Sequence, residues 1–326
     1  MAHPLPRCRG MIAHDAVAFR SILRPGDTLP VLANTGAGDG DQNRARETAA
    51  ALSRSGFDIT WLELEPADLP DAAREWVRRG VKAIAVAGGD GSISAVARVL
   101  LDTGVVLVPV PLGTMNHFAK RYGMESVEAV TQALADGIVV PVSAGMVDQI
   151  AFVNNASIGY YPHLVRHRER LRRWFGKWTA AVLAGGWVLL KLPPIELEVT
   201  VDGRTIRRHT VALWIGIGRN SLRLPLPGDA AHRASVLELV LPTPTSRIAL
   251  IALALRVWLR LRRRQPPSDS QLEILQGERV HIASRRPIDI ATDGEAHRLP
   301  SPIEVEHRPA ALHVLGRVDL RELSRM

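Results

Sequence analysis

The chain has 326 residues, of which 46% are hydrophobic and 23% are charged, a balance that excludes a disordered protein and is typical of a globular one. This length predicts two domains rather than one core. The formal net charge of +8 indicates anionic partners, which include nucleotides, acidic lipid headgroups and nucleic acid; charge alone does not choose among them.

Several classes of protein are disfavoured by what the sequence lacks. Cys8 is the one cysteine, so no internal disulfide can form, and the composition fits a reducing cytoplasm. Residues 1–10 contain two prolines and no apolar core, which does not resemble a signal peptide. No helix-turn-helix, zinc-finger or ribonucleoprotein pattern is visible, and aromatic residues make up only 5%, so nucleic acid is not the expected partner.

Residues in the first part of the chain alternate between short apolar runs and amphipathic stretches. The runs predict strands at 29–33, 59–64, 81–87 and 105–108, and the stretches predict helices at 42–54, 68–79 and 126–135. Such alternation is typical of a doubly wound parallel sheet. We therefore expect an α/β nucleotide-binding domain over residues 1–141.

The pattern changes after residue 141 to short β-rich runs separated by Gly, Pro and Asn. Residues 195–201 alternate apolar and polar side chains, and Asp202-Gly203 follows them, as in a half-exposed strand that enters a hairpin turn. Residues 142–326 are therefore expected to form an antiparallel, sandwich-like β domain, with a substrate bound in the cleft between the domains.

Two basic segments interrupt the β-rich part, at residues 162–190 and 246–264, and both are predicted helices. Their apolar portions fall short of the roughly 20 residues that span a membrane, so the protein is expected to be soluble or peripheral. Arginines beside tryptophans are typical of a surface that rests on an anionic bilayer; a solvated face over an ordinary core helix is the alternative. His163 and His167 have the spacing of a metal pair, but without a third ligand they are expected to face solvent.

The most informative stretch begins where the predicted strand 81–87 enters Gly88-Gly89-Asp90-Gly91-Ser92. Glycines allow backbone amides to approach a ligand closely, and a helix that starts here directs its positive end at the same point. A phosphate group is the ligand that suits both features.

A second loop follows the next predicted strand, which ends at residue 108 and turns at Pro109 to Pro111. It presents Gly113, Thr114 and Asn116, whose donors suit phosphate or ribose oxygens. In an open parallel sheet, ligands bind outside the carboxyl ends of the strands, where both loops are expected. Each loop alone is explained equally well as a simple turn or helix start; together they predict a nucleotide site.

Two further polar residues complete this expectation. Asp90 would be repelled by bound phosphates unless a cation lay between them, so we interpret it as a Mg²⁺ partner acting through the phosphates. Asn34 ends the first predicted strand before a glycine-rich loop that includes Gly38. That loop has neither the Rossmann nor the Walker spacing, and Asn34 is expected to line the nucleotide unless the loop is only a flexible turn.

Taken together, residues 88–92 and 111–120, followed by Phe-Val-Asn-Asn-Ala-Ser-Ile-Gly at 152–159 and Thr-Asp-Gly-Glu at 292–295, resemble the diacylglycerol kinase and sphingosine kinase family of lipid kinases. The resemblance implies ATP and Mg²⁺ as cofactors and transfer of the γ-phosphoryl group to a lipid hydroxyl, diacylglycerol-like by default. It also implies phospholipid metabolism, and a cytoplasmic protein that meets its substrate at the inner membrane face. NAD kinases and phosphofructokinases share the Gly-Gly-Asp-Gly loop, so that loop does not choose the substrate.

The resemblance also assigns a catalytic role. A predicted strand at 288–291 enters Thr292-Asp293-Gly294-Glu295, and moving a phosphoryl group onto an alcohol requires an acceptor for the hydroxyl proton. The family uses the Glu of this motif, which corresponds to Glu295. The alternative is a turn with incidental acids.

Three departures from the family pattern keep other functions open. Ser143 stands where many relatives have Asp, Ala234 lies in the place of an Asp-Gly turn that helps to hold a structural metal, and His117 follows Asn116 where Asp is common. The metal is therefore not expected. One alternative is a kinase for a soluble acceptor such as NAD or a sugar phosphate, and another is a regulator that binds nucleotide or lipid without catalysis.

Overall fold

The computed structural model describes residues 17–36, 42–159, 194–218, 236–243, 249, 252–253, 256 and 271–317. It divides the chain into a first unit, residues 1–144, 225–230 and 309–326, and a second unit, residues 145–224 and 231–308. The predicted basic helix at 162–190, with His163 and His167, lies outside the described residues, as do Cys8, Gly38 and Ala234. Of the second basic helix, only four positions are described.

The first unit is an α/β structure. Its strands are β1 (Val17–Ala18), β2 (Thr28–Asn34), β3 (Asp58–Leu64), β4 (Ala83–Gly88) and β5 (Val106–Pro111). Its helices are α1 (Phe19–Ile22), α2 (Gln42–Ser53), α3 (Leu69–Arg78), α4 (Asp90–Leu100), α5 (His117–Arg121) and α6 (Val127–Asp136). Two long strands, β6 (Ile138–Val147) and β17 (Ile303–Gly316), have residues in both units.

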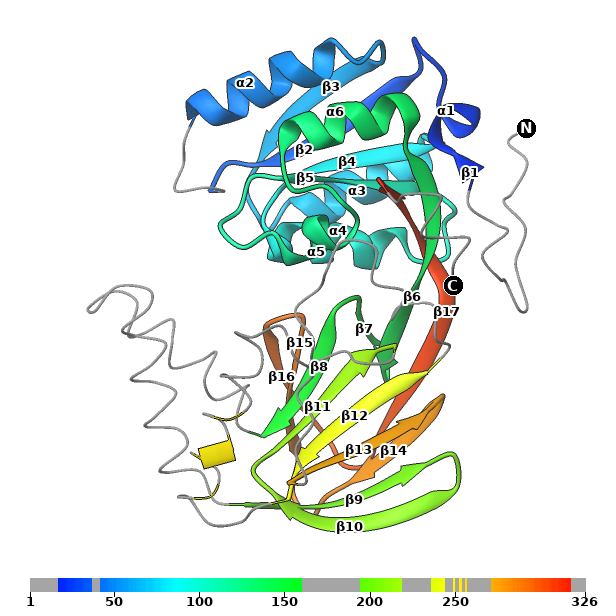
Figure 1. The fold of residues 1–326 in the computed structure, drawn as a ribbon. Helices are drawn as coiled ribbons and strands as arrows, with labels where there is room; N and C mark the ends of the chain where they lie inside the picture. Colours follow the sequence, from blue (N-terminus) through cyan, green and yellow to red (C-terminus); the bar gives the residue numbers. More distant parts are fainter. Residues whose placement is uncertain are drawn as a thin grey trace. The chain divides into compact units, whose positions relative to one another are not determined.

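The strands of this unit form a parallel sheet in the order β3-β2-β4-β5-β17. Helices α1, α2 and α6 pack together on one face, and α3, α4 and α5 pack on the other (Figure 1). Every residue of β4 and β5 is buried, because strands with helices on both faces have no solvent side. The predicted doubly wound parallel sheet is confirmed.

Local signals set several helix ends as expected. The Ser126 hydroxyl accepts a hydrogen bond from the Ala129 amide and so caps α6. Hydrogen bonds from the Glu128 backbone amide and from the Ser126 side chain lower the pKa of the Glu128 carboxyl. Gly80 follows α3 with a φ of 77°, the left-handed conformation that ends a helix. None of the helices in the described part of the chain combines the length and the apolar run needed to cross a bilayer.

The end of β5 differs from the prediction. The sequence indicates a turn at Pro109 to Pro111, but the strand continues to Pro111. The amide of Val106 donates to Lys82 O and that of Leu112 to Gly88 O, so even-numbered amides of β5 face β4. The backbone nitrogens of the odd-numbered prolines therefore face the other neighbour, β17. That strand pairs with β5 at Val106 and Leu107, before the prolines. Proline lacks an N–H but breaks no ladder bond here.

The second unit is built from antiparallel strands. They are β7 (Ile150–Phe152), β8 (Asn155–Gly159), β9 (Ile195–Val201), β10 (Arg204–Thr210), β11 (Ala212–Ile217), β12 (Leu237–Pro242), β13 (Leu272–Gly277), β14 (Arg279–Ala283), β15 (Ile288–Thr292) and β16 (Glu295–Leu299). One sheet has the order β13-β12-β11-β8-β15-β16, and the other contains β10-β9-β14 and the first residues of β17. Asp202 and Gly203 both have positive φ, which confirms the predicted hairpin turn.

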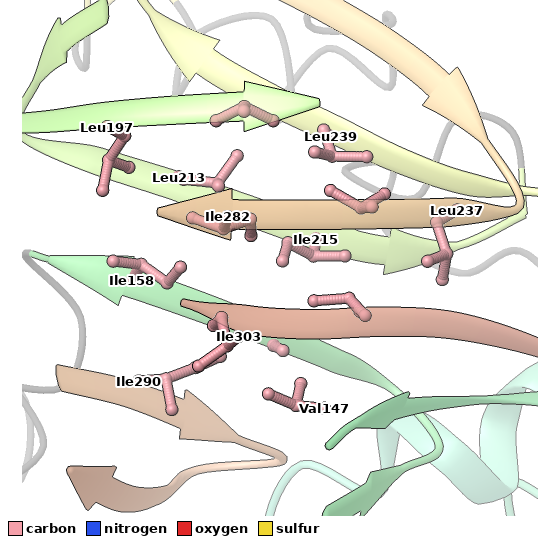
Figure 2. Close-up of a cluster of buried hydrophobic side chains, with 14 of the residues drawn as sticks. Val147, Ile158, Leu197, Leu213, Ile215, Leu237, Leu239, Ile282, Ile290 and Ile303 are labelled. Carbon is pink, nitrogen blue, oxygen red and sulfur yellow. The ribbon is translucent and has the colours of Figure 1, made fainter. Parts of the chain in front are cut away.

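One hydrophobic cluster joins the two sheets of this unit. Leu213, Ile215 and Leu239 from the six-stranded sheet pack with Leu197 and Ile282 from the other (Figure 2). The alternation of these strands places apolar side chains on the inner faces and polar ones outside. The predicted antiparallel, sandwich-like β domain is confirmed. The sequence indicated one boundary after residue 141, whereas the structure has the chain return to the first unit at residue 309.

Core packing in the second unit makes a first prediction. Ile215 is fully buried and Ile274, in the same sheet, is 48% exposed. We expect Ile215→Ala to lower the free energy of unfolding by about 2–5 kcal/mol, because it removes buried methyl groups and leaves a cavity. Ile274→Ala is the control and should cost less than about 1 kcal/mol. Urea unfolding followed by tryptophan fluorescence measures both; equal losses would contradict the assigned core.

Candidate functional site

Two glycine-containing loops meet at the carboxyl ends of β4 and β5. The carbonyl of Gly88 accepts hydrogen bonds from the amides of Leu112 and Gly113, at 3.1 and 3.2 Å. A Cβ placed on Gly113 would lie 2.4 Å from the Gly89 Cα, closer than side-chain carbons approach backbone. The loops therefore touch backbone to backbone, and glycine is what makes this contact possible.

The start of α4 offers amides to a ligand. Its first internal hydrogen bond runs from the Ile93 amide to Gly89 O, so the amides of Asp90, Gly91 and Ser92 precede the helical ladder. Gly89 is the N-cap residue and has no side chain to cap them, and a Cβ on Gly91 would meet open space. Donors and helix dipole together make this end suited to an anion.

A third loop is tied to the same place through Asn34, at the end of β2. Its side-chain amide donates to the Ser92 hydroxyl at 2.7 Å, and its side-chain carbonyl accepts from the Gly36 amide at 2.9 Å. A Cβ on Gly88 would lie 2.8 Å from the Ser92 Oγ. The structure therefore brings Asn34, Gly88 and Ser92 together, and Asn34 shapes the loop that follows it.

The second predicted loop is held mainly by its own residues. The Gly113 amide is already bonded to Gly88 O, while Thr114 is exposed. Asn116 has a left-handed backbone with φ of 52° and donates from Nδ2 to Gly113 O at 2.8 Å. Its Oδ1 is buried without a hydrogen-bond partner, an unusual state for a side-chain oxygen. This oxygen accepts hydrogen bonds, so a ligand group that donates, such as a ribose hydroxyl, would satisfy it, whereas a phosphate oxygen would not.

Asp90 has a structural bond that the sequence did not indicate. Its Oδ1 accepts a hydrogen bond from the Phe118 amide at 2.8 Å, and this satisfies one of the first amides of α5. Within the described ranges, no group of three or more His, Cys, Asp or Glu side chains is placed to hold a metal. Mg²⁺ often binds through one or two carboxylates while phosphates and waters complete its shell, and Asp90 fits that arrangement rather than an all-protein cage.

Arg44, on α2, is a site residue that sequence reasoning missed. Its Nη2 donates to Pro111 O at 3.0 Å, so a cation is attached to the start of the second loop. A lone arginine on a predicted surface helix carries no motif that would distinguish it from the other 40 Lys and Arg residues.

The Asp-Gly pair before Glu295 forms a two-residue hairpin turn between β15 and β16, and Asp293 and Gly294 both have positive φ. The Asp293 carboxylate accepts three backbone hydrogen bonds, from the amides of Val153, Asn154 and Asn155, at 2.8–3.1 Å. The turn interpretation is thus correct for the backbone. Asp293 fastens this hairpin to the segment between β7 and β8.

Glu295 is the first residue of β16, exposed and in register with Thr292 on β15. It belongs to the second unit, while Asp90 and the two glycine-containing loops belong to the first. Asp148, between β6 and β7, also has a structural contact, because its carboxylate accepts a hydrogen bond from the Glu304 amide at 2.9 Å. Ser143 is buried in β6.

Comparison with known proteins places this architecture. Residues 28–147 match the family model of the diacylglycerol kinase catalytic domain. The chain is 26% identical over 303 residues to a diacylglycerol kinase of Mycobacterium tuberculosis, covering 88% of this chain and 94% of that protein. The chain is similar to diacylglycerol kinases. The family resemblance predicted from the sequence is confirmed, and at the level of the family it indicates a phosphotransferase.

Other relatives agree with this family. A diacylglycerol kinase of Bacillus subtilis is 27% identical over 235 residues, which cover 70% of this chain and 76% of that one. A crystal structure of a Bacillus anthracis diacylglycerol kinase superposes with a TM-score of 0.65 at 18% identity, covering 89% of this chain and 97% of that one. This likeness shows that the two chains share a fold.

The contact between the Gly88–Ser92 loop and the Gly113–Asn116 loop makes a second prediction. We expect Gly113→Ala to lower the free energy of unfolding by about 1–3 kcal/mol, because its Cβ forces two backbones apart. The control is Gly91→Ala, whose Cβ meets open space and whose helix propensity rises by up to about 1 kcal/mol. Thermal unfolding compares the two, and an unchanged midpoint for Gly113→Ala would argue against the backbone contact.

The carboxylate of Asp293 makes a third prediction. In Asp293→Asn, an amide nitrogen replaces one oxygen that accepts from the backbone, so at least one N–H loses its partner. We expect a loss of about 1–3 kcal/mol in unfolding free energy, measured by urea titration. Asp58→Asn is the matched control, because exposed Asp58 accepts a single bond from Thr28 at 3.2 Å. If both variants are equally stable, the three-bond clamp is not significant.

Proposed function

We propose that the chain is an ATP-dependent lipid kinase that transfers the γ-phosphoryl group to a lipid hydroxyl, diacylglycerol-like by default. One observation carries the proposal: the Gly88–Ser92 and Gly113–Asn116 loops meet at one edge of a parallel sheet with uncapped helix amides and a buried, unpartnered Asn116 oxygen. The lipid acceptor is supported by the relatives that are named diacylglycerol kinase.

The nucleotide half of the proposal uses residues of the first unit. The amides of Asp90, Gly91 and Ser92 would bind phosphate oxygens, and the Ser92 hydroxyl and exposed Thr114 add further donors. Asp90 and the phosphates together would hold Mg²⁺, as the remaining Asp90 oxygen permits. When bound, ATP would supply the phosphoryl group, and Mg²⁺ would supply the positive charge that neutralises it.

The acceptor half uses the second unit. We assign Glu295 as the carboxylate that takes the proton of the lipid hydroxyl, because it is exposed at the end of a hairpin whose turn is anchored by Asp293. A general base contributes roughly 10²–10⁴-fold to a rate. Positioning of the phosphates by the loop amides would lower more of the barrier than this proton transfer.

A direct assay tests the function. Purified full-length chain is incubated with γ-labelled ATP and Mg²⁺, and with either diacylglycerol-containing vesicles or soluble acceptors such as NAD and sugar phosphates. Label in the lipid fraction supports the proposal. Label in a soluble product would replace the lipid by a soluble acceptor, and nucleotide binding without any product would indicate a regulatory protein.

The base assignment makes a fourth prediction. Glu295→Gln keeps the shape of the side chain but removes its proton-accepting charge, so we expect turnover to fall by about 10²-fold or more while ATP binding is unchanged. Glu306→Gln, an exposed glutamate on β17, is the matched control and should keep full activity. Steady-state kinetics and ATP titration measure the two effects; unaltered turnover would remove Glu295 from the role of base.

A further inference from the structure

Glu295 lies on a strand with weak support. Among the described strands, β16 is at the edge of the six-stranded sheet and pairs with β15 alone (Figure 1). It has five residues, none of them fully buried. Short, exposed edge strands open locally at low free-energy cost, and a residue at the end of such a strand samples many positions unless side chains hold it.

A side-chain hydrogen bond between Thr292 and His297 crosses this hairpin. The Thr292 Oγ1 and the His297 Nε2 lie 3.0 Å apart, and either atom can be the donor. Thr292 is fully buried and stands directly opposite Glu295 in the ladder. His297 is two residues beyond Glu295, so both side chains project from the same face of β16. The bond therefore joins the buried end of β15 to the exposed strand β16, close to Glu295.

The Asp293 clamp does not replace this bond. Its three amide donors, from Val153 to Asn155, fasten the turn and the end of β15 to the neighbouring segment. Strand β16 lies on the other side of the turn. The ladder and the contact of His297 with Thr292 both tie β16 to β15.

We propose that His297 is a positioning residue for Glu295: through its bond with Thr292 it keeps the start of β16 ordered and the Glu295 carboxylate in one place. This inference rests on the proposed function. A base must lie within hydrogen-bond reach of the hydroxyl it deprotonates, and small misplacements of a reacting group cost large factors in rate. The role therefore appears in kcat and not in the binding of ATP.

The test is a double-mutant cycle in the full chain. Thr292→Val and His297→Leu each remove one partner, and we expect each to lower kcat by about 10-fold, with the KM for ATP unchanged. The double variant should be no worse than about twofold below the poorer single one, because both remove the same bond. Thr292→Ser keeps the hydroxyl and should restore kcat. His281→Leu is the control, since His281 bonds to Glu304 on another strand pair.

Amide hydrogen exchange gives a readout that does not need turnover. We expect exchange across residues 295–297 to speed up in both single variants and to stay slow in Thr292→Ser and His281→Leu. Unchanged exchange, additive losses in kcat, or a change confined to the KM for ATP would each overturn the positioning role. If the native chain has no turnover, the proposed function fails and the catalytic role of His297 with it, while the exchange experiment alone still decides whether the bond orders β16.

Discussion

The loops at the carboxyl ends of β4 and β5 depend on one backbone contact. The Gly88 carbonyl accepts two amides of the following loop, and Gly89 touches Gly113 with no side chain between them. This contact brings the ends of β4 and β5 together and leaves the first amides of α4 uncapped. Any Cβ at Gly113 would push the two loops apart. The position of the amides that could bind an anion and the fold of this sheet edge therefore both require glycine at residue 113.

Two aspartates that stand in candidate functional motifs of the sequence accept hydrogen bonds from backbone amides in the structure. Asp90 bonds to the Phe118 amide and so orders α5, and Asp293 binds three consecutive amides between β7 and β8. Each is a carboxylate that satisfies N–H groups which would otherwise lack partners. Glu295, in contrast, is exposed at the start of an edge strand. Asp90 and Asp293 thus each hold backbone within their own unit, whereas Glu295 is the carboxylate proposed to accept a proton.

The order of secondary structure was predictable because each element carries its own signals. Apolar runs bounded by glycine predicted β2 and β4, a serine cap predicted the start of α6, and Asp202-Gly203 predicted a hairpin. The prolines of β5 were misread as a turn, because their effect depends on which neighbour their missing amides face. Strands β10 and β11 belong to different sheets although one residue separates them, and the Thr210 hydroxyl donates to Pro242 O at that break.

The sequence by itself indicated the family resemblance, the α/β and β-rich halves and the two glycine loops, since these follow from residue types at short spacing. Tertiary structure alone decided which groups are occupied: the Gly113 amide, one oxygen of Asp90 and the carboxylate of Asp293 all bond to backbone distant in the chain. It also revealed Arg44 at Pro111 and the pairing of Thr292 with His297. Each of these bonds joins a polar group to a partner that the folded chain places within about 3 Å. The residues next to that group in the sequence do not indicate which partner it will be.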